Sequence, residues 1–201
     1  MDETIATYDR SAAQFSASWG SLRLERALIA FGSRVGGPRR VLDLGCGPGR
    51  DVEHLTELGC WVVGLDLSSG MLAEARRNLP TALVVRADLR DPPFASSSFE
   101  GIWACASLLH LARSQLPNAL LGLGRLLRQS SGVLYLALKV GQGESWSANR
   151  SGCRSFFSFY QPPEITTALA EAGFQVLEDW VAPDKGGRDR PWLNVIARMQ
   201  G

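Results

Sequence analysis

The chain alternates between short apolar runs and stretches whose apolar residues recur every three or four positions. The runs RRVLDLG (39–45), WVVGLDL (61–67), ALVVRADL (82–89), SFEGIWACA (98–106) and GVLYLALKV (132–140) are typical of buried strands. Helices are expected over residues 4–18, 21–34, 50–58, 68–79 and 113–128. Strands that alternate with helices and are apolar on both faces predict a doubly wound parallel sheet in an α/β fold.

The pattern changes after Val140. Residues 141–154 are polar and glycine-rich, and the aromatic segment SFFSFY (155–160) follows them. A helix is expected from Pro163 to Ala172, and two strands over 174–182 and 192–199. Because a polar loop rather than a helix joins these two strands, we expect them to be antiparallel. The complete prediction is a seven-stranded mixed sheet that ends in an antiparallel hairpin.

Length and composition favour a single domain over residues 1–201. The 201 residues, 45% of them hydrophobic and 20% charged, are enough to bury one core. We divide the chain into an N-terminal helical cap (1–35), a core (36–140), a lid or insert (141–161) and a C-terminal helix and hairpin (162–201). The formal net charge is +1 and no run of like charges occurs, which argues against a nucleic-acid or acidic-membrane partner.

The four cysteines, Cys46, Cys60, Cys105 and Cys153, show no C-x-x-C spacing and have no histidine nearby. This argues against a zinc site and against a disulfide-stapled secreted fold. The first ten residues carry acids where a signal peptide would carry basic and apolar residues, and no apolar run is long enough to span a membrane. We expect a cytoplasmic protein with reduced thiols and no metal.

The segment VLDLGCGPGRD (41–51) places three glycines, Gly45, Gly47 and Gly49, between the first strand and the next helix. Doubly wound sheets bind ligands at this end of their strands, where glycine permits close approach and the helix offers free N–H groups. The spacing is G-x-G-x-G, with Arg50 at the third glycine position of a dinucleotide fingerprint, and no Walker lysine follows. Asp66 ends the second strand, and its carboxylate could accept both hydroxyls of a ribose.

Three segments in this order, VLDLGCGPG, VVGLDLSSGML and VVRADLRDPPF, resemble the first motifs of class I S-adenosylmethionine-dependent methyltransferases, over about residues 41 to 140. The resemblance implies a Rossmann-like fold and a glycine loop that lies against the amino-acid part of the cofactor. It also implies that Asp66 holds the ribose hydroxyls and that Asp88 faces the adenine amino group, with the backbone of Leu89 nearby. The segment CASLLH (105–110) would then line the floor beneath the methyl donor, beginning with Cys105.

Other residues complete the cofactor prediction. Leu67 and Met71 are suitably placed to cover one face of the adenine, and Cys46 contributes its backbone to the loop. Asp43 either contacts the cofactor or satisfies N–H groups of the loop. Without a ligand, Asp66 would act as a helix cap and Asp88 as a turn residue before Pro92 and Pro93.

The acceptor side is less defined by the sequence. The fourth strand is followed by ACASLLH, and not by the Asn-Pro-Pro-Tyr or Asp-Pro-Pro-Tyr of amino-group methylation, and no acidic cluster suggests bound magnesium. The resemblance is to the small-molecule branch, in which segments equivalent to residues 1–20 and 141–161 close over the acceptor. The candidate acceptor-side residues are His110, Tyr8, Trp19, Arg154 and Tyr160.

Each candidate has a structural alternative. His110 could orient a hydroxyl or accept its proton, or could make a structural hydrogen bond. Tyr8 could reach the cofactor or acceptor, or pack in the core. Phe156, Phe157 and Phe159 could form an aromatic wall or pack a lid, and His54 is expected at the surface or in packing.

The sequence thus predicts S-adenosylmethionine-dependent methyl transfer to a small-molecule acceptor, with S-adenosylhomocysteine as product, by a monomer or homodimer without a membrane partner. Three alternatives stay open. They are a tRNA or protein methyltransferase, a non-catalytic cofactor-binding module, and a nicotinamide-dependent oxidoreductase, for which the missing fingerprint glycine is poor support.

Overall fold

Helices and strands alternate along the chain in the computed structural model, which describes residues 2–20, 22–37, 39–148, 154–184 and 190–201. The helices are α1 (Asp2–Trp19), α2 (Glu25–Gly32), α3 (Arg50–Glu57), α4 (Ser69–Asn78), α5 (Leu116–Leu126) and α6 (Pro162–Glu171), with 3₁₀ turns η1 (Leu108–His110) and η2 (Arg113–Gln115). The strands are β1 (Arg40–Leu44), β2 (Trp61–Asp66), β3 (Leu83–Arg86), β4 (Gly101–Cys105), β5 (Val133–Lys139), β6 (Glu144–Ala148), β7 (Arg154–Ser158), β8 (Phe174–Ala182) and β9 (Trp192–Met199).

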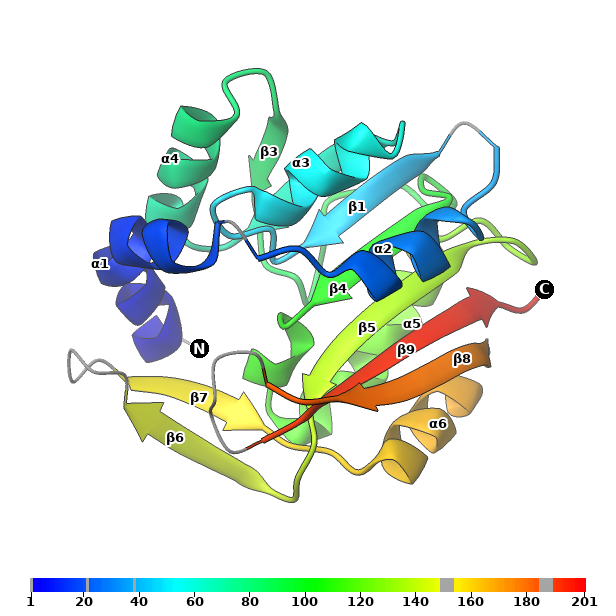
Figure 1. The fold of residues 1–201 in the computed structure, drawn as a ribbon. Helices are drawn as coiled ribbons and strands as arrows, with labels where there is room; N and C mark the ends of the chain where they lie inside the picture. Colours follow the sequence, from blue (N-terminus) through cyan, green and yellow to red (C-terminus); the bar gives the residue numbers. More distant parts are fainter. Residues whose placement is uncertain (1, 21, 38, 149–153, 185–189) are drawn as a thin grey trace.

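Seven strands form one mixed sheet in the order β3-β2-β1-β4-β5-β9-β8 (Figure 1). The first five are parallel, and β9 lies antiparallel between β5 and β8. The predicted fold class, including the antiparallel C-terminal strands, is therefore confirmed. The strand order reverses direction at β1, and the helices that follow β1 and β4 lie on opposite faces of the sheet. Ligands bind at this position in such sheets, outside the carboxyl ends of the strands.

Apolar residues cover both faces of the sheet because successive side chains point to opposite sides. In β5, one set of side chains packs toward α5 and α6, namely Leu134, Leu136 and Leu138. The other set packs toward α2 and α3, namely Val133, Tyr135 and Ala137. The near-continuous apolar runs in the sequence reflect this two-sided burial. The core is thus two layers of apolar side chains, one on each side of the strands.

The polar, glycine-rich segment 141–154, for which the sequence predicted no strand, contains strand β6, which pairs antiparallel with β7 as a separate two-stranded ribbon. Trp146 and Phe156 lie opposite each other with ring centroids 5.5 Å apart. Such cross-strand aromatic pairs stabilise a ribbon. The serine- and glycine-rich composition concealed the alternation in ESWSA, so no strand was predicted for residues 144–148.

Two predicted helices are shorter than expected. The helix predicted over 21–34 begins at Glu25, and the one predicted over 113–128 starts as the 3₁₀ turn η2 before α5. Pro117 stands in the first turn of α5, where its missing N–H leaves no hydrogen bond unmade.

Helix α1 lies between α4 and the β6–β7 ribbon, across the carboxyl ends of the parallel strands (Figure 1). Two buried threonines, one turn apart, join it to β7. Thr7 Oγ1 donates to the carbonyl of Arg154 (2.7 Å), and Thr4 Oγ1 accepts from the Phe156 N–H (3.0 Å). These bonds satisfy backbone groups at the open edge of β7.

Among the described residues, no helix is long and apolar enough to cross a membrane, and no group of three or more histidine, cysteine or acidic side chains could hold a metal ion. Cys46, Cys60 and Cys105 are free thiols. Cys153 lies outside the described residues.

Candidate functional site

The glycine loop follows β1 and is pinned to the neighbouring strand. The N–H groups of Gly45 and Cys46 both donate to the carbonyl of Leu65 (2.7 and 2.9 Å). Gly45 has φ +78°, and a Cβ there would lie 2.4 Å from Ser107 Cβ, so only glycine fits. Gly47 has φ +54°, and a Cβ there would meet no atom within 4 Å. The loop therefore leaves open space on the Gly47 side, where a bound group can approach the backbone.

The Asp66 carboxylate, at the end of β2, holds the loop and the next helix together. One oxygen accepts from the Gly47 N–H (2.9 Å) and the other from the Ser68 N–H (2.8 Å). Burial raises the pKa of this half-buried group, while the hydrogen bonds from Ser68 and Gly47 oppose the rise. Each oxygen keeps further acceptor capacity, which is what a ribose diol requires.

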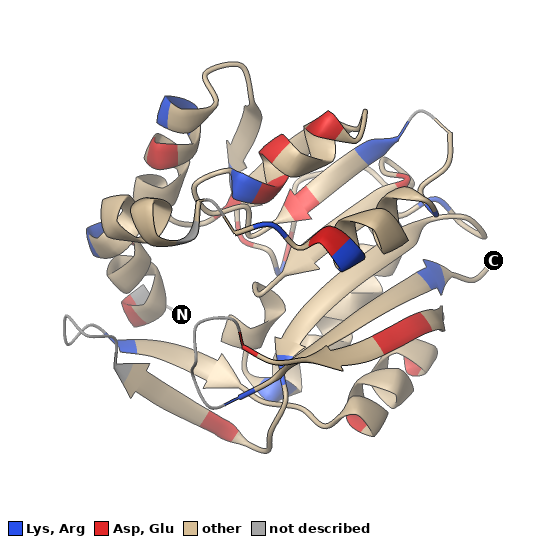
Figure 2. Ribbon diagram, viewed as in Figure 1, with Lys and Arg blue, Asp and Glu red and all other residues tan. Residues whose placement is uncertain are grey.

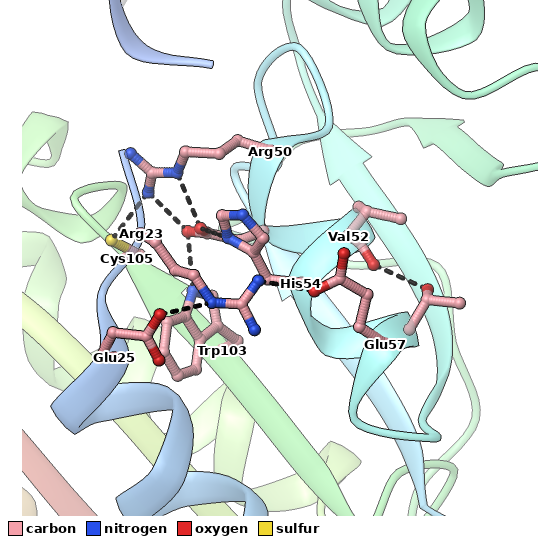
Figure 3. Close-up of polar contacts among 10 residues, drawn as sticks. Arg23, Glu25, Arg50, Val52, His54, Glu57, Trp103 and Cys105 are labelled. Atoms are coloured by element: carbon pink, nitrogen blue, oxygen red, sulfur yellow. Dashed lines mark hydrogen bonds and ion pairs between the residues drawn. The ribbon is translucent and has the colours of Figure 1, made fainter. Parts of the chain in front are cut away.

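Beneath the loop, Asp43 is 2% exposed and its Oδ2 has no hydrogen-bond partner among the described residues. Its neighbour Asp51, the second residue of α3, is satisfied. Arg50 donates to both Asp51 oxygens (2.8 and 2.7 Å), and the Trp103 indole N–H donates to Oδ2 (2.9 Å; Figure 3). The sequence did not indicate this Arg50–Asp51–Trp103 cluster, because Trp103 lies 52 residues from Asp51 in the chain and meets it only in the fold.

Asp88 follows β3 and is paired with Arg90. The Arg90 guanidinium contacts both carboxylate oxygens, and the Arg90 N–H donates to Oδ1 (2.9 Å). The Arg90 hydrogen bonds hold the pKa of Asp88 below its ordinary value. An adenine amino group that donates to Asp88, as predicted, would therefore have to share the carboxylate oxygens with Arg90 or displace it. Leu89 is half-buried and packs against the core below.

The remaining predicted cofactor residues are apolar or weakly polar. Leu67 is half-buried, Met71 is buried in α4, and Cys46 is buried beside Gly64. Cys105 ends β4, and its thiol lies 3.6 Å from an Arg50 nitrogen (Figure 3). Burial raises the pKa of both thiols, so neither is a thiolate at neutral pH.

Tyr8 and His110 meet although they are 102 residues apart in the chain. The Tyr8 hydroxyl lies 2.8 Å from His110 Nε2. Phe157 also packs against the imidazole, with ring centroids 4.9 Å apart. Burial raises the pKa of Tyr8, and the negative charge of Asp66 raises it further, which places the phenol within electrostatic reach of the loop site.

The protonation of His110 follows from its partners. Nδ1 lies 2.7 Å from the Phe156 carbonyl, which can only accept, so Nδ1 carries the hydrogen. Burial lowers the pKa of His110 to about 4, while the Phe156 carbonyl opposes the fall, so the ring is neutral at pH 7. Nε2 is therefore an acceptor, and Tyr8 donates to it.

The structure does not bring Arg154 to this pair. Its side chain is exposed and its guanidinium lies over the Trp146 ring, 5.2 Å from the centroid. Only its carbonyl takes part in the site, as the acceptor for Thr7. Successive side chains of a strand point to opposite faces, so Arg154 and Phe156 project from one face of β7. Phe157, whose ring packs against His110, projects from the other face.

The other acceptor-side candidates are dispersed. Tyr160 is buried beneath the Arg113 guanidinium (4.6 Å), and Phe159 is buried beneath Arg190 (4.1 Å). His54 is buried in α3, as the packing interpretation expected. Trp19 ends α1, and its side chain lies outside the described residues.

The sequence did not indicate Asp9, whose carboxylate links α1 to the start of α4. Its Oδ1 accepts from the Ser68 hydroxyl (2.6 Å) and the Gly70 N–H (2.8 Å) at the start of α4. Burial raises the pKa of Asp9, but these hydrogen bonds lower it more, to a net value below the ordinary one. The only available signal was the polar face of TIATYD, in which Thr4, Thr7 and Tyr8 recur at helical spacing.

Charge of both signs is scattered over the described elements (Figure 2). Acidic residues stand where β1 and β2 end, at Asp43 and Asp66. The site is thus locally acidic in a molecule that is nearly neutral, a setting that suits a cationic ligand.

Comparisons with known proteins agree with this geometry. The family model of a methyltransferase domain matches residues 41–130. The chain is 35% identical to trans-aconitate 2-methyltransferase of Methylobacterium nodulans, over 79% of this chain and 71% of that protein. It is 36% identical to a malonyl-[acyl-carrier protein] O-methyltransferase of Erwinia pyrifoliae, over 58% of this chain and 44% of that protein. The chain covers less than two thirds of the length of such malonyl relatives, with 26%, 44% and 56% of three of them matched.

A similar fold occurs in Burkholderia thailandensis 1,6-didemethyltoxoflavin-N1-methyltransferase, solved with its acceptor and S-adenosylhomocysteine. The TM-score is 0.78 at 20% identity, over 100% of this chain and 88% of that one. The strand order, the glycine loop with Asp66, and the trans-aconitate relative all lead to one assignment. The chain belongs to the class I S-adenosylmethionine-dependent methyltransferase family.

Proposed function

We propose that this protein transfers the methyl group of S-adenosylmethionine to an oxygen atom of a small-molecule acceptor. The observation that carries the choice of oxygen is the pair formed by Tyr8 and His110. His110 presents a neutral acceptor nitrogen, and Tyr8 presents a hydroxyl, within electrostatic reach of the Asp66 carboxylate. With its hydrogen donated to Nε2, the Tyr8 oxygen can accept a hydrogen bond from the hydroxyl of an acceptor.

The residues around the glycine loop fit the cofactor. Asp66 would hold the ribose hydroxyls, the open side of Gly47 would admit the amino-acid part, and Asp88 with Leu67 and Met71 would surround the adenine. When bound, the sulfonium group supplies an already activated methyl donor. The chain then has mainly to orient the acceptor and exclude water, and orientation of this kind can supply roughly 7 to 11 kcal/mol.

His110 limits the acceptors that can be deprotonated. With its pKa lowered to about 4, the imidazole is a weak base. It can orient a hydroxyl, or take the proton of an acidic one through Tyr8, whose phenol proton moves to Nε2 as the acceptor proton reaches the phenol oxygen. A carboxylate acceptor needs no such transfer, and the Tyr8 hydroxyl would hold it by turning its hydrogen from Nε2 to the carboxylate. We therefore propose carboxylates and acidic hydroxyls as the acceptor class, and the names of the trans-aconitate and malonyl relatives support this.

The test is a cofactor-consumption screen. Conversion of S-adenosylmethionine to S-adenosylhomocysteine is measured with sets of small carboxylic acids, phenols and amines, and separately with total RNA, and methylated products are identified by mass spectrometry. We expect an ester or ether product. Methylation of amines or RNA alone would contradict the proposal. Cofactor binding without turnover of any acceptor class would favour the non-catalytic module.

Two variants test whether Tyr8 and His110 take part in the methylation that the screen detects. Tyr8→Phe and His110→Gln should lower turnover of the acceptor that is found while leaving cofactor affinity nearly unchanged. His110→Gln keeps hydrogen bonding without basicity, so a larger loss with acidic hydroxyls than with carboxylates would indicate proton transfer. A nicotinamide-dependent oxidoreductase does not fit, because the chain belongs to a methyltransferase family.

A further inference from the structure

Helix α1 is attached to the rest of the molecule mainly by polar contacts. Of the α1 side chains that the structure describes, only Thr4, Thr7 and Ala12 are buried, so apolar packing contributes little to its position. Its main contacts are with the start of α4 and with strand β7 (Figure 1). The side chains that α1 carries over the carboxyl ends of the strands therefore depend on these two contacts for their placement.

Three consecutive residues of α1 each form a hydrogen bond with a different element. The Thr7 hydroxyl donates to β7, the Tyr8 hydroxyl donates to His110 in η1, and the Asp9 carboxylate accepts from α4. Neighbouring residues of a helix project about 100° apart around its axis. Thr7 and Asp9 thus anchor α1 on either side of Tyr8, and together they prevent the helix from rotating about its axis.

The anchor on α4 consists of three hydrogen bonds to one oxygen. Asp9 Oδ1 accepts from the Ser68 hydroxyl (2.6 Å), the Ser69 hydroxyl (3.3 Å) and the Gly70 N–H (2.8 Å). A carboxylate at the first turn of a helix satisfies an N–H group that has no partner within the helix, and its charge complements the helix dipole. Ser68 also donates its own N–H to Asp66 (2.8 Å). Asp9 therefore fixes α1 to the same turn that contacts the proposed ribose-binding carboxylate.

The backbones of α1 and α4 approach each other closely at this point. A Cβ on Gly70 would lie 2.7 Å from the Asp9 carbonyl oxygen and 2.9 Å from the Asp9 Cα. Both atoms belong to the backbone, so α1 itself would have to move to admit a side chain. Gly70 has no positive φ, so its backbone angles do not require glycine. The absence of a side chain at this position thus sets the distance between the two helices.

We propose that Asp9 is a positioning residue for the methyl transfer and that it acts through Tyr8. Its hydrogen bonds to the first turn of α4, where Gly70 permits close approach, hold the Tyr8 hydroxyl on His110 Nε2 and at a fixed distance from the cofactor site. The effect on catalysis rests on the proposed function. The effect on the contact between Tyr8 and His110 concerns the free protein and is tested separately.

Nitrogen NMR of the full chain with isotope-labelled histidine tests the contact without cofactor or acceptor. The chain has two histidines, His54 and His110, so the spectrum contains few signals. In the parent, His110 should show the Nδ1–H tautomer with a hydrogen bond accepted by Nε2. Tyr8→Phe removes this bond and gives the reference position of the Nε2 signal. Asp9→Ala should move the Nε2 signal toward that reference and leave the His54 signals unchanged.

Gly70→Ala makes the same test without removing a polar group. Its Cβ should displace α1 from α4 and shift the His110 signal in the same direction. Gly122→Ala is the matched control, because it also replaces a helical glycine, in α5, and its Cβ would meet no atom within 4 Å. An Nε2 signal at the parent position in either Asp9→Ala or Gly70→Ala would overturn the inference. If Asp9→Ala does not fold, Gly70→Ala decides the result.

Turnover tests the effect on catalysis once the screen has supplied an acceptor. Asp9→Ala and Gly70→Ala should lower kcat by up to roughly 100-fold, because a displacement of about 1 Å can have such an effect. Asp9→Asn keeps an acceptor oxygen and should restore part of kcat, and Gly122→Ala should match the parent.

A double variant shows whether Asp9 acts through Tyr8. If it does, adding Tyr8→Phe to Asp9→Ala should lower kcat little further. Losses that multiply in full would overturn the inference. Absence of turnover with every acceptor class would reject the proposed function, and the His110 signals would still decide whether Asp9 positions Tyr8.

Discussion

Replacing Asp66 by alanine tests the centre of the proposed cofactor site. The carboxylate accepts hydrogen bonds from the N–H groups of Gly47 and Ser68, and it would also hold the ribose hydroxyls. A hydrogen bond to a charged group contributes roughly 1.5 to 3 kcal/mol. Loss of the ribose contact should therefore weaken cofactor binding by roughly 10- to 150-fold, at about 1.4 kcal/mol for each factor of ten.

The structure adds a second effect that the sequence did not show. Alanine leaves the Gly47 and Ser68 N–H groups without their acceptor, so the empty loop should lose stability as well as affinity. Thermal unfolding reports the loss of stability, and calorimetry with S-adenosylhomocysteine reports the loss of affinity. Asp66→Asn, which keeps the size and one acceptor oxygen, should lie between the parent and Asp66→Ala in both. A folded Asp66→Ala protein that binds the cofactor like the parent would remove Asp66 from the site.

Three further outcomes are expected. His110→Ala should lower turnover once an acceptor is known. Because the pKa of His110 is about 4, this group should cause no change in the activity of the parent protein between pH 6 and 8. A change in activity within that pH range that His110→Ala abolishes would contradict the neutral state of His110. Thr7→Val removes a buried donor to β7, so it should destabilise the protein by about 1 to 3 kcal/mol, measured by denaturant unfolding; an unchanged midpoint would show that α1 is not held there. Although burial raises the pKa of Glu100, its bonds with Arg40 and Arg128 lower it to about 2, below the ordinary 4.5. Its ionised form therefore adds stability above pH 4.5 that is lost as pH falls toward 2, and Glu100→Gln should remove about 1 to 3 kcal/mol at pH 7 and flatten this acid dependence.

Local patterns were sufficient for the fold because the signals lie close together in the chain. The apolar runs of β1, β2, β4 and β5 predicted buried parallel strands, and the polar loop before β9 predicted an antiparallel end. The ribbon formed by β6 and β7 was missed because its stability comes from a cross-strand pair, Trp146 with Phe156, rather than from either segment alone.

The candidate site divides in the same way. Gly45, Gly47 and Asp66 were predictable, because the turn after a strand demands unusual backbone angles and the acid follows at a fixed spacing. The pairing of Tyr8 with His110 was not, although each was a candidate, since nothing local relates a helix at the start of the chain to a turn 102 residues later.

What the sequence by itself determined is therefore the class of fold, the glycine loop and the acids at the ends of β1 and β2, because periodicity and turn chemistry act over a few residues. Only the tertiary structure decided which polar groups are satisfied. It committed Arg50 to Asp51, turned Arg154 toward solvent, and left one carboxylate oxygen of Asp43 buried without a hydrogen-bond partner among the described residues. Burial and hydrogen bonding depend on neighbours brought together from distant segments, and these neighbours set the protonation of His110 and Asp43.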